Sequence, residues 1–118
     1  MITWQENIDI YLHRDPVDFR KAINGLSLIV SEVLELPPFD RSLFVFCNKR
    51  RTQLKALYWD ETGFALWQKR LEKDKFKWPK RVNSQKVNIT HEQWCWLLRG
   101  FDFTKIKPHP RLEFSRIN

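Results

Sequence analysis

Most of the expected sheet lies in residues 43–79, which read LFVFCNKRRTQLKALYWDETGFALWQKRLEKDKFKWP. Short runs rich in aromatic and β-branched residues alternate there with polar turns, a pattern typical of strands that follow one another in a meander. We expect antiparallel strands over 42–48, 53–59 and 64–71. The same residues carry many cations, so the predicted sheet also presents groups that attract phosphate.

The connections in this stretch set the strand boundaries. Asp60-Glu61-Thr62-Gly63 is a turn signal, in which Gly63 is free to take a positive φ. Phe64, Trp67 and Leu71 lie at helical spacing, but the turn before them favours a strand. Cations and rings alternate over 75–78, which predicts an edge strand that Pro79 ends.

A strand and a helix are expected before the meander. Residues 8–13, IDIYLH, predict the first strand. Asp15 is placed to cap a helix that begins at Pro16 and runs to about Leu34, with one polar stripe and a broad apolar face. Gly25 interrupts this helix, which we attribute to close approach to a strand.

After the meander we expect a basic connector over 80–86 and a short second helix. Thr90 and Gln93 form a capping box for that helix, and Gly100 marks its end. The predicted fold class is α+β, a single domain with a mostly antiparallel sheet, one long helix on a face and a short C-terminal helix. We assign residues 1–103 to that domain and 104–118 to a loosely ordered basic tail.

Composition narrows the class of protein. The chain has 118 residues, 42% of them hydrophobic, which suits one folded domain. It contains no apolar run long enough to span a bilayer and no pattern of a secretion signal, so we expect a cytoplasmic protein without membrane contact. Cys47 and Cys95 are expected to be reduced and buried. Twenty-one Lys and Arg against 14 Asp and Glu give a net charge of +7, which favours a polyanionic partner.

Catalytic chemistry has little support in the sequence. The three His and two Cys do not form a metal-ligand pattern, no glycine-rich phosphate loop is present, and we predict no metal site and no cofactor. The alternative that stays open is a metal-dependent nuclease. Asp40, followed by Gln53-Leu54-Lys55, is a distant variant of an acid…acid-x-Lys pattern in which Gln replaces the second acid.

The cations form the stronger candidate site. They gather at a predicted hairpin tip and in the stretch that begins at the end of the third strand of the meander, both exposed positions from which side chains reach phosphates. Lysines on an edge strand also prevent aggregation, which would account for those at 75 and 77. The candidate DNA contacts are Lys49, Arg50, Arg51, Lys69, Arg70, Lys75, Lys77, Lys80 and Arg81, with Trp78 as a stacking residue.

The order of these residues resembles a known family, the TnpB-type accessory proteins of the insertion-sequence-66 group of transposable elements. The resemblance covers residues 8–79. It is carried by Asp18-Phe19-Arg20-Lys21, Gly25-Leu26, Leu43-Phe44-Val45-Phe46, Lys55, Leu57, Trp59-Asp60, Gly63, Lys69-Arg70-Leu71-Glu72, Phe76 and Trp78-Pro79.

This resemblance implies a role in transposition beside a separate, larger transposase, and it implies no catalytic residues. Five positions of the family pattern have no role that the resemblance supplies: Arg20, Lys21, Lys55, Trp59 and Asp60. The tip CNKRRTQ departs from the family in lacking glycine. We therefore expect a non-catalytic accessory protein that binds DNA through a basic surface and assists the transposase. The alternatives are a module that docks on the transposase without touching DNA, and the nuclease.

Overall fold

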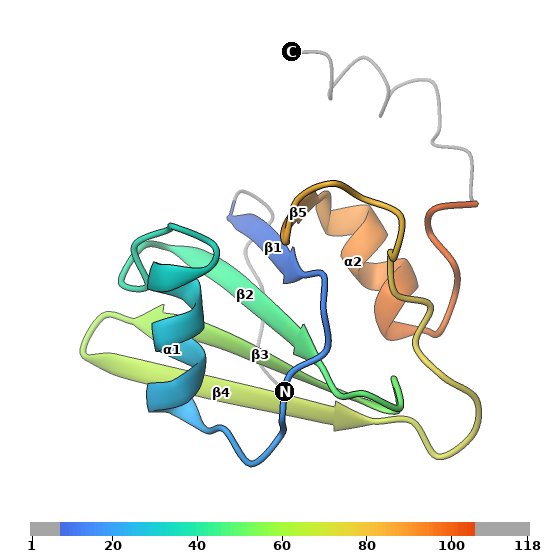
Figure 1. Cartoon of the computed structure of the whole chain (residues 1–118), viewed down its shortest axis with the longest axis horizontal. Helices are drawn as coiled ribbons and strands as arrows, with labels where there is room; N and C mark the ends of the chain where they lie inside the picture. The colour runs from blue at the N-terminus through green and yellow to red at the C-terminus, as the bar shows by residue number, and fades with distance from the viewer. Residues whose placement is uncertain (1–7, 106–118) are drawn as a thin grey trace.

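A computed structural model of the chain describes residues 8–105, which contain a five-stranded sheet of order β4-β3-β2-β1-β5 (Figure 1). β1 and β2 are parallel, and every other neighbouring pair is antiparallel. The prediction of an α+β fold with a mostly antiparallel sheet is confirmed. The strands are β1 (Asp9–His13), β2 (Ser42–Cys47), β3 (Gln53–Asp60), β4 (Gly63–Arg70) and β5 (Lys86–Ile89).

Two helices, α1 (Ile23–Glu32) and α2 (His91–Leu98), cover opposite faces of this sheet. β2 is central, and because both its faces are covered, all six of its residues are buried. On the α1 face, Leu26 and Val30 of the helix pack against Phe44, Phe46 and Leu57 of the sheet.

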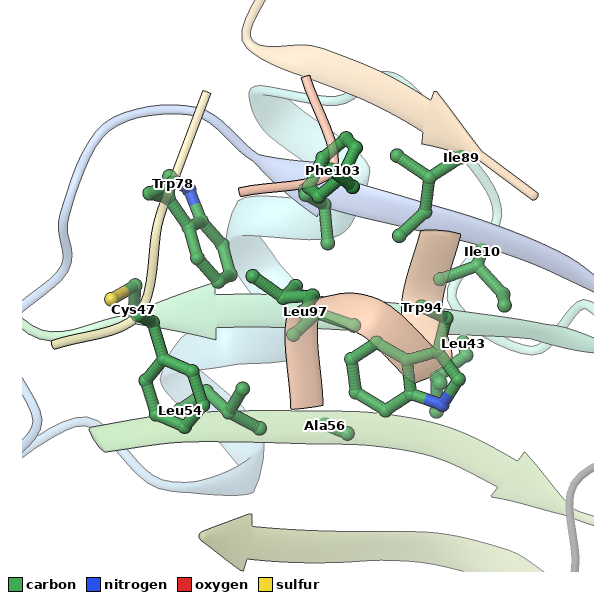
Figure 2. Packing of buried hydrophobic residues seen from close by; sticks show 13 residues of the cluster. Ile10, Leu43, Cys47, Leu54, Ala56, Trp78, Ile89, Trp94, Leu97 and Phe103 are labelled. Atoms are coloured by element: carbon green, nitrogen blue, oxygen red, sulfur yellow. The ribbon is translucent and has the colours of Figure 1, made fainter. Parts of the chain in front are cut away.

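The α2 face holds the larger core. Figure 2 shows Trp94 and Leu97 of α2 lying over Leu54 and Ala56 of β3. Buried residues from outside the regular elements complete this cluster, among them Phe76, Trp78 and Phe103. These three aromatic side chains fix the irregular segments around residues 76–78 and 103 against the sheet, and both segments matter for the candidate site.

The predicted first helix is wrong in length. α1 begins at Ile23, its N-cap is Ala22 without a side-chain hydrogen bond, and it spans ten residues rather than 16–34. The residues expected to form its first turns are used otherwise. The Val17 amide bonds to the Cys47 carbonyl at 2.9 Å, and the Lys21 amide closes a turn onto the Asp18 carbonyl at 3.0 Å. Asp15, the expected cap, instead bonds to Gln85.

Two errors concern strands. Residues 75–78 are not a strand, although their side chains alternate as in one: Phe76 and Trp78 are buried, and Lys75 and Lys77 are exposed. The alternation arises because the segment lies over the α2-side core, without a sheet partner. The edge strand beside β1 is β5, at the end of the predicted connector, where Lys86 to Ile89 pair with β1; β4 forms the other edge.

The glycines also differ from expectation. A Cβ at Gly25 would meet the Lys21 side chain at 3.2 Å, so the close neighbour is a lysine and not a strand. In the β3–β4 turn the positive φ belongs to Glu61, at 50°, and Gly63 pairs with Asp60 in the ladder. Gly100, after α2, does have a left-handed φ of 84°.

Other expectations have mixed outcomes. The capping box of Thr90 and Gln93 is present at α2 and confirms the second helix. Both cysteines are free, but only Cys47 is buried; Cys95 is exposed.

No helix within residues 8–105 is long and apolar enough to cross a membrane. Of the predicted tail, residues 106–118 lie outside the described part of the chain.

Candidate nucleic-acid interface

The tip of the β2–β3 hairpin is built by Asn48. Its side-chain oxygen accepts hydrogen bonds from the amides of Thr52 and Gln53 at 2.9 and 3.0 Å, and its carbonyl accepts from the Arg51 amide at 3.0 Å. This is a tight turn followed by one left-handed residue, a position that usually takes glycine. Here Arg51 occupies it, with φ 62°. A cation is therefore held here in a sparsely populated backbone conformation.

Arg51 also joins the tip to the segment after β4. Its carbonyl accepts a hydrogen bond from the Phe76 amide at 2.7 Å, and the neighbouring Thr52 carbonyl accepts from the Leu71 amide at 2.8 Å. These two bonds bring cations that are distant in sequence to the same end of the sheet. Figure 1 shows the hairpin tip, the loop after β4 and the chain following α2 at this end.

Buried rings then orient the cations of residues 75–80. Phe76 is 1% exposed and Trp78 is 5% exposed, and the Trp78 indole N–H donates to the His13 carbonyl at 3.0 Å. Lys75 and Lys77 alternate with these anchors and are exposed. The lysines of this segment therefore point to solvent on one side because its aromatic rings pack in the core on the other.

The next residues are fixed to β1. The Arg14 guanidinium donates to the Val82 carbonyl at 2.7 Å, and the Arg14 amide donates to the Gln85 carbonyl at 2.9 Å. Across from them, Phe103 is buried and Asp102 closes a small turn by accepting from the Thr104 amide at 3.0 Å. The Thr104 hydroxyl hydrogen bond, more than any other contact, lowers the pKa of the Asp102 carboxyl, so this group is ionised at neutral pH.

Together these segments line an open hollow of about 720 Å³. Its walls include one carboxylate, Asp102, and the rings of Phe76 and Trp78. We call it the basic hollow, after its six cationic lining residues: Arg51, Lys75, Lys77, Lys80, Arg81 and Lys105.

Arg51 is the most enclosed of the six. Its residue is partly buried, and one terminal guanidinium nitrogen is covered and has no hydrogen-bond partner within residues 8–105. The side chain lies close enough to Cys47 to act on its thiol. Burial nevertheless dominates there and raises the pKa of Cys47 to about 12.

The remaining predicted contacts lie elsewhere. Lys49 and Arg50 are exposed at the hairpin tip but do not line the hollow. The Lys69 ammonium donates to the Leu98 carbonyl at 2.8 Å and so ties β4 to the end of α2. Arg70 pairs with Glu72 at 3.1 Å on the surface. Trp78 is a core residue with little exposed ring, and we do not propose it as a stacking residue.

Three of the family-pattern positions, Lys55, Lys21 and Arg20, build the connection between β1 and α1. The Lys55 ammonium donates to the carbonyls of Phe19 and Lys21, each at 2.9 Å, and lies 4.7 Å from the centre of the Phe19 ring. The lysine of the nuclease-like pattern is thus engaged in holding this connection. Arg20 donates to the carboxylate of Asp18, and this pairing lowers the pKa of that carboxyl to about 2.

The last two family-pattern positions shape the β3–β4 end. Trp59 packs edge-on against Phe39 and Phe64, with ring centres 5.1 Å apart in both pairs. Asp60 accepts a hydrogen bond from the Thr62 amide in the turn. Because Trp59 and Asp60 end β3 while Arg51 precedes it, this aromatic cluster lies at the opposite end of the strand from the basic hollow.

One wall of the hollow, formed by Asp102, Thr104 and Lys105, was not predicted from the sequence. Nothing in the local sequence links these residues to the hairpin tip; only the burial of Phe103 brings them there. Within residues 8–105, no group of three or more His, Cys, Asp or Glu side chains is placed to hold a metal ion. His91 and Cys95 do approach each other, at 3.9 Å on α2, and the cysteine is the exposed partner.

The fold and the hollow define a small, basic α+β domain with six cationic side chains around one hollow at an end of its sheet. The sequence model of the family described as IS66 Orf2-like protein matches residues 8–108, and the chain belongs to that family. The family is one of accessory proteins associated with transposition, and it is not known as catalytic.

Two relatives in Sinorhizobium fredii are similar along almost their whole length. The uncharacterized protein y4jC is 36% identical over 110 residues, covering 93% of each chain. The uncharacterized protein y4hO is 33% identical over 103 residues, covering 87% of this chain and 89% of its own. No solved structure matches the chain.

Proposed function

We propose that the protein binds DNA through backbone phosphates at the end of the sheet that carries the basic hollow, and thereby assists the separate transposase of its element. The observation that supports this most directly is the gathering of six cations around one hollow. Arg51 and the lysines at 75 and 77 belong to distant parts of the sequence, and the Phe76–Arg51 hydrogen bond holds them together.

The surrounding acids leave this charge largely intact. Of the six lining cations, only Lys77 forms an ion pair within residues 8–105, with Asp74 at 3.2 Å. Both partners are well exposed, and a pair in that setting contributes little and is screened by salt. A phosphate backbone therefore meets a cationic surface that has few internal partners to give up.

Contacts of this kind predict strong dependence on salt and weak dependence on sequence. If about five phosphates are neutralised, log K for duplex DNA should fall with log[salt] at a slope of roughly −4 to −5. A flat slope, or no binding at low salt, would remove the proposal.

A matched pair of double variants tests where the contacts lie. Replacing Lys80 and Arg81 by Gln removes two lining cations, and we expect the slope to become shallower by about 2. Replacing Lys21 and Lys86 by Gln removes two exposed cations outside the hollow and should leave the slope nearly unchanged. Equal losses from both pairs would mean that net charge matters and that its location does not.

A second candidate function is docking on the transposase, and the β3–β4 end favours it. Phe39 is 62% exposed although it packs on Trp59 and Phe64, so an aromatic surface is available there, as in protein interfaces. Co-purification with the transposase should then be lost in Phe39→Ser and unchanged when Arg50 and Arg51 become Ala. The reverse result would assign the interaction to the basic end.

A further inference from the structure

We infer that the basic hollow is a phosphate pocket, in which one phosphate group of a nucleic-acid strand is held against Arg51. The inference rests on the proposed function for the origin of the phosphate, but the pocket itself is argued from its own geometry. It assigns a specific anchor within what is otherwise a broad cationic surface.

The dimensions and charge of the hollow suit such a ligand. Pockets that enclose small ligands measure roughly 300–1,000 Å³, and this hollow, at about 720 Å³, lies within that range. It has room for a phosphate with its attached sugar, whereas a flat surface would contact a duplex only from outside. Six cations against one carboxylate give the lining a net positive charge, which favours an anionic ligand such as a phosphate group.

Arg51 has the properties of an anchor. Its guanidinium is partly withdrawn from water, one nitrogen is covered without a hydrogen-bond partner within residues 8–105, and a charge in this position is stabilised by a nearby anion. The planar guanidinium can donate two parallel hydrogen bonds to a phosphate, which an ammonium cannot. The left-handed φ of 62° also destabilises the folded state at Arg51, in addition to its covered guanidinium nitrogen. Strained residues of this kind concentrate at functional sites.

The walls are anchored to the rest of the domain. Phe76, Trp78 and Phe103 pack in the α2-side core, and hydrogen bonds join Trp78 to His13 of β1 and Val82 to the following Arg14. Binding therefore needs little reordering of the backbone, which lowers the entropic cost of association. The lysines on the rim remain free to adapt to the strand.

Asp102 opposes the ligand and gives a sharp test. Its carboxylate accepts from the Thr104 amide at 3.0 Å, so Asp102→Asn keeps an acceptor for that turn and removes the negative charge from the wall. A phosphate in the hollow should then bind more tightly. Loss of folding cannot produce a gain, so this variant separates binding from stability.

The experiment follows backbone amide and Trp78 indole NMR signals while sodium phosphate is added to the full chain at constant ionic strength. We expect saturable shifts around the hollow, affinity at least tenfold weaker in Arg51→Gly, and affinity about threefold tighter in Asp102→Asn. Arg50→Gly, one residue away and outside the lining, is the control and should stay within twofold of the unaltered protein. Shifts that do not saturate, or equal losses from Arg50 and Arg51, would overturn the pocket.

Two further arms separate the pocket from the proposed function. If duplex DNA binds with a steep salt slope while phosphate gives no saturable shift, the proposed DNA binding is supported and the phosphate pocket is rejected. If phosphate saturates the hollow but neither duplex nor single-stranded oligonucleotide binds, the phosphate pocket is supported and the proposed DNA binding is rejected. Tighter binding of sodium succinate than of phosphate would show a preference for carboxylates and would overturn the choice of ligand.

Discussion

The Lys55 ammonium donates a hydrogen bond to the backbone carbonyl of Phe19 at 2.9 Å, from a strand to a connection 36 residues earlier. A second bond, to the Lys21 carbonyl, has the same length. Lys55 is only 7% exposed, so its charge is compensated mainly by these carbonyls and the Phe19 ring. A lysine at a family-pattern position thus stabilises the approach to α1.

Replacing Lys55 by Met should destabilise the domain by about 2–4 kcal/mol, because two charge-assisted hydrogen bonds are lost and two carbonyls lose their donor. Lys75→Met, at an exposed lysine, is the control and should change stability by less than about 0.5 kcal/mol. Urea unfolding of both variants measures the difference. If Lys55→Met lowers the free energy of unfolding by less than about 1 kcal/mol, the connection between β1 and α1 is stable without the Lys55 hydrogen bonds.

His13 gives the stability of the domain a pH dependence. It is 6% exposed, its Nδ1 lies 2.7 Å from the Asp15 carbonyl, and its ring lies against Phe46. Burial lowers the pKa of His13 below its usual 6.5, although the contact with Asp15 partly offsets this. The unfolded chain therefore takes up the proton first as pH falls, and stability declines below about pH 6.5.

The change with pH should not exceed about 1.4 kcal/mol per unit from this one group. His13→Asn keeps a donor for the Asp15 carbonyl and cannot be protonated in this range. We expect thermal unfolding at pH 7.0 and 5.5 to show a smaller decrease in Tm for His13→Asn than for the unaltered protein. Equal decreases would assign the effect to other groups.

Local patterns were sufficient to predict much of this fold. The meander residues alternate or carry turn signals, and the strands β2, β3 and β4 end within about a residue of their expected bounds. Thr90 and Gln93 specify the start of α2 by themselves. An element can be predicted from the sequence where the residues that specify it lie within a few positions of one another.

The errors share a different cause. Lys55 and Cys47 act on residues 17–21 from other strands, and this long-range bonding shortens the first helix despite its good local signals. Trp78 looked exposed because it alternates with lysines, but its anchor is the distant His13 carbonyl. The hollow likewise depends on Phe103, so its third wall could not be derived from the basic stretch alone.

The conformation of Arg51 predicts opposite effects from two neighbouring glycine substitutions. At φ 62° glycine relieves strain, so Arg51→Gly should leave stability unchanged or raise it by up to about 1 kcal/mol. Arg50 is not at positive φ, so Arg50→Gly should cost about 0.5–1 kcal/mol through the flexibility of the unfolded chain. Parallel denaturant titrations compare them. If Arg51→Gly lowers the free energy of unfolding more than Arg50→Gly does, the Arg51 side chain stabilises the protein by more than its backbone strain destabilises it.

The two cysteines should differ sharply in reactivity. Burial raises the pKa of Cys47 from the ordinary 9.0 to about 12, so its thiolate is scarce at pH 8, and the core also shields the sulfur. Cys95 is exposed on α2 beside His91. Iodoacetamide at pH 8 should therefore alkylate Cys95 within minutes and leave Cys47 unmodified until denaturant is added, as peptide mass analysis would detect. Cys95→Ser provides the control, since this variant should show no rapid phase. Rapid labelling of Cys47 in the folded protein would mean that the β2 end of the core opens readily, and with it the support of Arg51.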